Sequence, residues 1–213
     1  MRTGANLSLT PDQAHYLTRV MRADIFLAFH NGDEFECRVG NGRFLVGKKT
    51  KRADLSGGWT IYFAPIKRIE DLVSAVVQMG AGRLVPVITE RTVARNINPD
   101  RMRRVIIEAA EQSGRNSLPE LAPPVRFADV DWSGVVFGDE RMAHSAEFRV
   151  KSSELRVAWR EANSKLLIGP EGGFSEVEFK ALDALGAVGV GLGRTILRAE
   201  VAAVALAAKV INA

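Results

Sequence analysis

Apolar and polar positions alternate in the first part of the chain and follow a helical spacing in much of the rest. Around Gly40 and Gly42 the alternating stretches predict a β-hairpin, and residues 61–66 predict one more strand. Pro11 predicts a short helix before the hairpin, because proline suits the first turn of a helix. We therefore expect a mostly β segment that ends near residue 65.

Beyond that point helices and strands are expected to alternate. The apolar positions from Ile69 to Val77 recur at helical spacing, which predicts an amphipathic helix. Asn98 and Pro99 are typical of a helix start, and Ser175 with Glu178 has the spacing of a capping box. Further helices are predicted at residues 154–162 and 199–212, and strands at residues 84–88, 135–140, 165–169 and 188–193. Apolar strands in alternation with helices are typical of a parallel sheet covered on both faces.

The change of pattern predicts two domains, a small β-rich domain at residues 1–65 and an α/β domain at residues 66–213. The chain has 213 residues, of which 46% are hydrophobic, enough for a substantial core. The single cysteine, Cys37, allows no internal disulfide and favours a reducing compartment. The N-terminal residues lack the apolar run of a signal peptide, and no stretch is apolar for long enough to form a membrane helix. We therefore expect a cytoplasmic protein.

Two kinds of enzyme chemistry lack the residues that they need. His15, His30 and His144 lie far apart, and no cluster has the spacing of metal ligands, so no metal is expected. A serine hydrolase is not expected either, because the G-x-S-x-G turn does not occur.

Basic residues are clustered, although the net charge is only +4. Six of them and no acidic residue lie between Cys37 and Ala53, and a second arginine-rich stretch runs from Arg83 to Arg104. Clustered Lys and Arg indicate a polyanion as partner. A solvated basic surface without a partner is the alternative.

Two glycine-rich loops each follow a predicted strand and lead into a predicted helix. They are the run LIGPEGG at residues 167–173 and the run GLGRTILRAE at residues 191–200. Ligands of α/β proteins bind at the carboxyl ends of strands, where glycines let them approach the backbone. The first loop is neither a dinucleotide-binding fingerprint nor a phosphate-binding P-loop. The alternatives are a tight turn with a helix cap for the first loop and a surface turn for the second. Glu171 and Glu200 could act as acid and base, whereas Arg115, in the run EQSGRN, could instead complement a helix dipole.

The stretches LLIGPEGGFSEVEF and GLGRTILRAEVAA resemble the two cofactor loops of the SPOUT methyltransferases. Together with QAHYLTRVMR, RIEDLVSAVVQMGAGRLVPVITERT and RMRRVIIEAAEQSGRNSLPEL, they are similar to the RsmE family, which methylates N3 of a uridine in 16S ribosomal RNA. The resemblance covers nearly the whole chain, and the pair of C-terminal motifs in this order is specific.

The resemblance implies a PUA-like β-barrel that binds RNA, followed by an α/β domain with a trefoil knot. It also implies a homodimer, S-adenosylmethionine as cofactor, and 16S ribosomal RNA or the assembled small subunit as partner. The residues that it assigns to the cofactor are Leu167, Ile168, Gly169, Pro170, Glu171, Gly172, Gly173, Leu192, Gly193, Ile196, Leu197, Arg198 and Ala202.

For catalysis we expect Arg198 and Arg115 to stabilise negative charge on the uracil, and Glu200 to accept a proton or to orient an arginine. RNA contacts are expected from the basic residues Arg19, Arg22, Arg38, Arg43, Lys48, Lys49, Lys51, Arg52, Arg101 and Arg104.

Two alternatives stay open. The first is a methyltransferase of the same superfamily that acts on a ribose 2′-hydroxyl or on another base. The second is a non-catalytic RNA-binding protein that keeps the fold. The feature in favour of the second is Val201, where the family usually has threonine.

Overall fold

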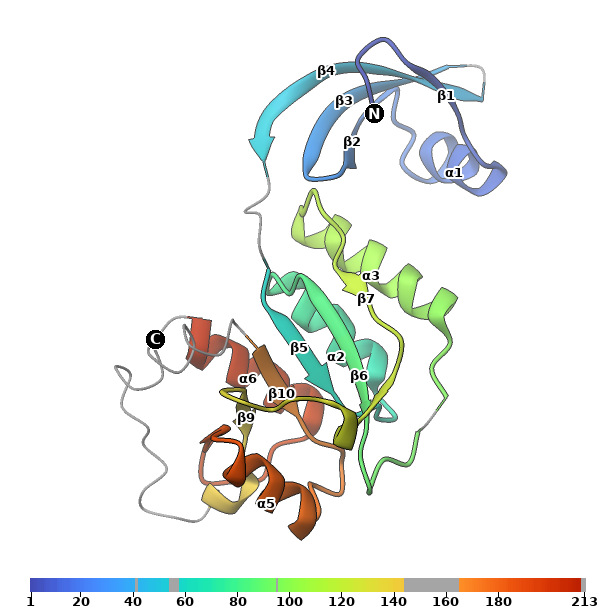
Figure 1. Ribbon diagram of the computed structural model, residues 1–213. Coiled ribbons are helices and arrows are strands. Elements are labelled where there is room, and N and C mark those ends of the chain that lie inside the picture. Colours follow the sequence, from blue (N-terminus) through green and yellow to red (C-terminus); the bar gives the residue numbers. More distant parts are fainter. Residues whose placement is uncertain (41, 54–57, 95, 144–164, 212–213) are drawn as a thin grey trace. The chain divides into compact units, whose positions relative to one another are not determined.

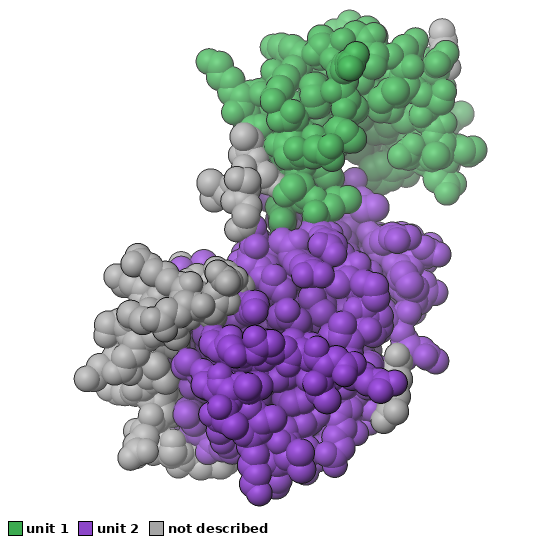
Figure 2. All heavy atoms as spheres, in the orientation of Figure 1, with its two compact units in different colours: residues 1–56, 114–118 green, residues 57–113, 119–213 purple. Residues whose placement is uncertain are grey.

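The structure is a computed structural model that describes residues 1–40, 42–53, 58–94, 96–143 and 165–211 (Figure 1). The chain forms two compact units, which Figure 2 shows in different colours. The first comprises Met1–Ser56 with Gly114–Leu118, and the second Gly57–Ser113 with Pro119–Ala213. The predicted helix at residues 154–162 lies outside the described residues.

The first unit contains an antiparallel sheet of four strands in the order β1-β4-β3-β2. Its elements are β1 (Asn6–Ser8), α1 (Pro11–His15), the π-helical turn η1 (Tyr16–Val20), β2 (Ile25–His30), β3 (Asp33–Gly40) and β4 (Arg43–Ala53). Phe35, Cys37 and Val46 are buried on one face of the sheet and form its core. The predicted hairpin is confirmed as β3 and β4, and the predicted helix as α1, with Pro11 at its start and Thr10 as its cap.

The returning segment Gly114–Leu118 is bonded to this first unit. The Nδ2 atom of Asn116 donates to the carbonyl of Arg52 at 3.3 Å, and the backbone N–H of Gly32 donates to the carbonyl of Asn116 at 3.0 Å. The Nη2 atom of Arg52 donates to the carbonyl of Gly114 at 2.6 Å. Because buried backbone groups require partners, these bonds keep the segment with the small sheet.

The second unit is an α/β fold with a parallel sheet, as predicted. The sheet has the order β11-β9-β10-β5-β6-β7, and β8 pairs with β6. Its strands are β5 (Thr60–Phe63), β6 (Arg83–Ile88), β7 (Glu120–Leu121), β8 (Val125–Arg126), β9 (Val136–Gly138), β10 (Lys165–Ile168) and β11 (Val188–Val190). Its helices are α2 (Ile69–Gln78), α3 (Pro99–Ser113), α5 (Glu176–Ala184) and α6 (Ala199–Ile211), with short 3-10 turns η2 (Phe127–Asp129) and η3 (Glu140–Met142).

Helices pack against the sheet because side chains alternate across each strand. On one face Leu167 of β10 and Phe137 of β9 pack with Phe179 and Leu182 of α5 in an aromatic-rich core. Helix α6 contacts β9 and β10, and it packs beside α2, which in turn contacts α3 (Figure 1). The helix starts agree with their sequence signals. The Oδ1 atom of Asn98 accepts from the backbone N–H of Arg101 at 3.1 Å, and the capping box of Ser175 and Glu178 is present.

The position of β5 corrects the expected domain boundary. We expected residues 61–66 to belong to the β-rich domain and the boundary to fall after residue 65. Instead β5 pairs in parallel with β10 and β6, so the first boundary lies at residues 56/57. Ile61 and Phe63 are fully buried, as is typical of a central parallel strand rather than of a sheet with one exposed face.

Candidate functional site

Three loops enclose a cavity of about 260 Å³ at the carboxyl ends of the adjacent strands β9, β10 and β11. Such a place is where open α/β sheets bind their ligands. The lining residues are Gly138, Asp139, Glu140, Ala143, Ile168, Gly169, Pro170, Glu171, Gly172, Gly173, Leu192, Gly193, Thr195, Ile196, Leu197, Ala199 and Ala202.

The loop after β10 is a tight turn that requires glycine. Gly173 has a φ of +71°, and its N–H donates to the carbonyl of Pro170 at 2.9 Å. A side chain at Gly169 would approach the ring of Phe174 to 2.9 Å. The backbone of this turn is therefore left open toward the cavity, without side chains at its glycines.

Side chains from the loop after β6 hold this turn in place. Arg91 donates through Nη1 to the carbonyls of Gly172 and Phe174, at 3.0 and 3.2 Å. The buried carboxylate of Glu178 accepts from the backbone N–H groups of Ser175 and Glu90, at 2.9 and 2.8 Å. Glu178 thus completes the capping box of α5 and also joins the β6 loop to the loop that follows β10.

The loop after β11 is supported by α6. Lys209 donates from Nζ to the carbonyl of Gly191 at 2.9 Å, and burial lowers the pKa of this lysine. Gly193 has a φ of +148°, and a Cβ atom there would meet nothing within 4 Å, so the backbone at this point faces open space.

The third loop, which follows β9, supplies acidic residues to the cavity. Asp139 is buried and lies between Arg141 and the strand β11, whose Val190 carbonyl accepts its N–H at 3.0 Å. The carboxylate of the half-buried Glu140 accepts from the backbone N–H groups of Glu140 itself and of Phe174. Burial raises the pKa of Glu140, and the negative charge of Asp139 adds to this effect.

The predicted cofactor residues gather mostly around this cavity. Eleven of the thirteen line it. The two exceptions are Leu167, which is fully buried in the core on the α5 side, and Arg198, which is exposed and is not among the lining residues. The sequence did not predict that the β9 loop, with Asp139 and Glu140, lines the cavity. The one signal for this loop was its position directly after an apolar strand.

The predicted catalytic residues come from both units of the chain. Arg198 and Glu200 lie at the start of α6, where Glu200 pairs with Arg68 at 3.7 Å. The Glu200 side chain is only 12% exposed. Arg115 lies in the segment Gly114–Leu118 of the first unit.

The predicted RNA-binding residues are exposed, but several are already engaged. Lys49 pairs with Asp33 at 2.6 Å, and Arg52 lies 3.9 Å from Glu34 and bonds to Gly114. Arg101 pairs with Glu70. Within the described residues, by contrast, Arg38, Lys48 and Lys51 have no ion pair, and neither do Arg19, Arg22, Arg43 or Arg104.

The described residues contain neither a candidate metal cluster nor a candidate membrane-spanning helix. No group of three His, Cys, Asp or Glu side chains in this part of the chain could hold a metal ion. No described helix is long and apolar enough to cross a membrane.

Comparisons with known proteins agree with one another. Residues 56–211 match the family model of the RNA methyltransferase domain. Ribosomal RNA small subunit methyltransferase E of Synechocystis is 31% identical over 93% of this chain and 70% of that protein, and its Rickettsia conorii namesake is 28% identical over 92% and 85%. Among solved structures, ribosomal RNA small subunit methyltransferase E of Neisseria gonorrhoeae, bound to S-adenosylmethionine, has a TM-score of 0.78 at 23% identity, with 98% of this chain and 92% of that chain covered. A Legionella pneumophila protein in complex with the same cofactor has a TM-score of 0.76 at 24% identity, over 100% and 93%.

Proposed function

The chain belongs to the RNA methyltransferase family, among the ribosomal RNA small subunit methyltransferases E, and from this we propose that it transfers a methyl group from S-adenosylmethionine to 16S ribosomal RNA. The acceptor that we propose is N3 of a uridine. The observation that carries the proposal is the cavity itself. Two of the three loops that enclose it are the glycine-rich motifs that the family match includes, and the loops lie at adjacent strand ends.

The residues of the cavity fit this cofactor. Glycine backbone at Gly172 and Gly193 leaves room for a ligand to approach N–H and C=O groups, while Ile168, Leu192 and Leu197 offer apolar contact. Mixed apolar and backbone-polar lining is typical of sites for small organic cofactors. S-adenosylmethionine supplies an electrophilic methyl group on a sulfonium centre.

We propose that side chains of the protein remove the N3 proton of the uracil and stabilise the negative charge that develops on the base. The N3 atom of uracil carries a proton, so it becomes a good nucleophile only when that proton leaves. We propose that Glu200, which is nearly buried and held by Arg68, accepts or relays this proton. Arg198 and Arg115 are proposed to stabilise negative charge on the carbonyl oxygens of the base.

The proposal also includes the details of the fold and the oligomeric state. We propose that the second unit contains a trefoil knot, and that the small antiparallel sheet is part of a PUA-like RNA-binding domain. We also propose a homodimer that acts in the cytoplasm, where ribosomal RNA is found. The apolar side chains that α6 exposes support the dimer.

The test is to map methylated nucleosides by mass spectrometry after incubation of the protein with cofactor and either naked 16S RNA or small subunits. A 3-methyluridine is expected. Methylation at a ribose or at another base would instead favour the first alternative. Calorimetry with S-adenosylmethionine tests the second, because an RNA-binding protein without catalysis should give no cofactor heat.

The variant Gly172→Val tests where the cofactor binds. A Cβ atom at this position would lie 3.6 Å from Cβ of Arg91, which is an ordinary contact, so the fold should survive. We expect the branched side chain to block the cavity and abolish cofactor binding. Undiminished binding by the folded variant would place the cofactor elsewhere.

A further inference from the structure

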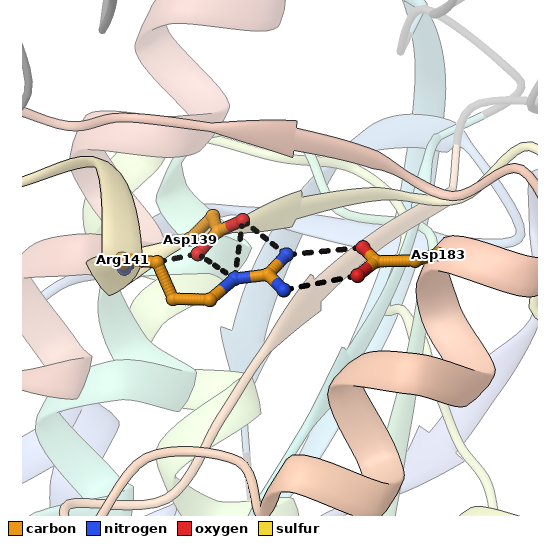
Figure 3. A network of polar contacts seen from close by, with 3 residues as sticks. All are labelled: Asp139, Arg141 and Asp183. Carbon is orange, nitrogen blue, oxygen red and sulfur yellow. Dashed lines mark hydrogen bonds and ion pairs between the residues drawn. The ribbon is translucent and has the colours of Figure 1, made fainter.

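Arg141 is bound on both sides by carboxylates, next to the cavity but outside its lining (Figure 3). Its Nε and Nη2 atoms donate to Asp139 at distances from 2.7 to 3.1 Å. Its Nη1 and Nη2 atoms donate to the two oxygens of Asp183 in α5, both at 3.0 Å. The guanidinium carbon also lies 4.1 Å from the ring centre of Phe179. A planar arginine in two-oxygen contact with a carboxylate is held in one geometry.

The burial of Asp139 makes this contact necessary for the loop. The Asp139 side chain is only 1% exposed, and its charge would be uncompensated without Arg141. Gly189 of β11 leaves the space that Asp139 occupies, because a Cβ atom there would lie 2.7 Å from Oδ2 of Asp139. The β9 loop therefore has one arrangement in which Asp139 is both packed and neutralised.

Glu140 lies between Asp139 and Arg141 in sequence and is one of the residues that line the cavity. Its carboxylate reaches Gly173 so closely that a Cβ atom on Gly173 would lie 2.1 Å from Oε1 of Glu140. It accepts from the backbone N–H groups of Glu140 itself and of Phe174, but the two oxygens of a carboxylate offer about four acceptor sites. Those sites can receive a hydrogen-bond donor of a ligand in the cavity.

We propose that Glu140 binds a hydrogen-bond donor of S-adenosylmethionine, such as a hydroxyl, amino or ammonium group, and that Arg141 is the positioning residue that holds Glu140 in place through Asp139 and Asp183. The proposal rests on the proposed function, because it assumes that this cavity is the cofactor site. It adds a third loop to the two that the sequence motifs indicate. It also connects the end of α5 to cofactor binding.

The test is a double-mutant cycle on cofactor affinity, measured by calorimetry with S-adenosylmethionine. Glu140→Gln and Arg141→Ala are each expected to weaken binding about tenfold, as expected for loss of one charge-assisted hydrogen bond. Because Arg141 acts through Glu140, the double variant should also lose about tenfold rather than the hundredfold product of independent effects. Arg141→Lys should restore part of the affinity, since an ammonium can pair with one carboxylate but cannot reproduce the two-sided contact.

The matched control is Arg83→Ala. Arg83 also pairs with a carboxylate, Glu120 at 3.4 Å, in the same unit but away from the cavity, so cofactor affinity should not change. If Arg141→Ala does not fold, Asp183→Asn weakens one side of the contact only and should give a smaller loss of affinity.

The outcomes separate the two proposals. If the wild-type protein binds no cofactor, the proposed function fails, and this inference fails with it. If wild-type binds and either single variant binds equally well, or if the two losses multiply, the role of Glu140 and Arg141 is refuted while the proposed function stands.

Discussion

At the scale of single residues, Gly173 and Gly186 provide a matched pair. Both have a φ of +71°, but a Cβ atom at Gly186 would meet nothing within 4 Å, whereas one at Gly173 would collide with Glu140. Each change to alanine should lower the free energy of unfolding by about 1–2 kcal/mol, the usual strain of a left-handed conformation. The Glu140 carboxylate can move away from the new methyl group, so the collision should affect cofactor binding rather than stability. Calorimetry should show weaker cofactor binding for Gly173→Ala and unchanged binding for Gly186→Ala. Equal affinity of the two variants would contradict a role for Glu140.

The pKa of Glu140 leads to a second residue-level prediction. Because burial raises this pKa above the ordinary 4.5, the folded state holds the proton more tightly than the unfolded chain does. The contribution of Glu140 to wild-type stability should therefore be lost as pH rises from about 4.5 through the folded-state pKa. Glu140→Gln cannot titrate, so without cofactor it should be more stable than wild-type at pH 7 and should lose that advantage below pH 4.5. Urea unfolding from pH 4 to 8 measures the difference. A constant difference across this range would show that Glu140 does not titrate as expected.

The residues of the cavity illustrate what sequence can and cannot predict. The glycines of the β10 and β11 loops were predicted because strand-end glycines have a direct physical purpose. Leu167 was grouped with them, although alternation along β10 turns its side chain into the core. Asp139, Glu140 and Arg141 gave no comparable signal. Their role depends on Asp183, which is distant in sequence and comes close only through the packing of α5.

At the scale of elements, α6 is apolar on nearly all sides. Ala203, Leu206, Ala207 and Val210 are buried, but Val201, Val204 and Ile211 are exposed by 48%, 37% and 40% and recur at helical spacing. A helix that is hydrophobic all round is normally buried, so the exposed side of α6 is suited to a second copy of the chain.

This view of α6 predicts the effect of charge on the dimer. Val201→Glu combined with Val204→Glu should give a monomer in light scattering at micromolar protein, because burying two carboxylates in an interface is costly. Val177→Glu is the control. Val177 is 72% exposed on α5 and should tolerate the charge without a change of mass. A monomeric wild-type protein, or a double variant that stays dimeric, would reject this interface.

Helices were easier to predict than strand neighbours. The starts of α3 and α5 follow from local caps at Asn98 and Ser175, which act within a few residues. The place of β5 was wrong in the sequence interpretation, because parallel pairing joins residues that are far apart in the chain. Thr60 pairs with Lys165 on one side and Arg83 on the other, and no local pattern reveals such partners.

At the scale of the whole molecule, the two proposed binding functions lie in different units. The cavity belongs to the second unit, and the basic stretch at residues 38–52 belongs to the first. The sequence could not reveal that Gly114–Leu118 returns to the first unit. That return depends on bonds of Arg52 and Gly32, which are remote in sequence. It places Arg115 in the unit that we propose to bind RNA.

The division predicts separable effects on RNA and on cofactor. Arg38, Lys48 and Lys51 are exposed and have no ion pair within the described residues, whereas Arg43 donates to the carbonyl of Asn6 at 3.4 Å. These three are therefore the side chains of the basic stretch at residues 38–52 that are best able to contact phosphates. Changing all three to alanine should weaken RNA binding. It should also flatten the dependence of log affinity on log salt by at most about two units, since each phosphate contact contributes about 0.7 on single strands.

The comparison variant is Lys49→Ala with Arg52→Ala, whose side chains already pair with Asp33 and Glu34. This variant should lower the thermal stability of the first unit. For each residue removed, it should change the slope of log RNA affinity against log salt less than the triple variant does. Cofactor affinity should be the same in both variants as in wild-type. An unchanged salt slope in the triple variant would mean that this cluster is a solvated surface and that RNA is bound elsewhere.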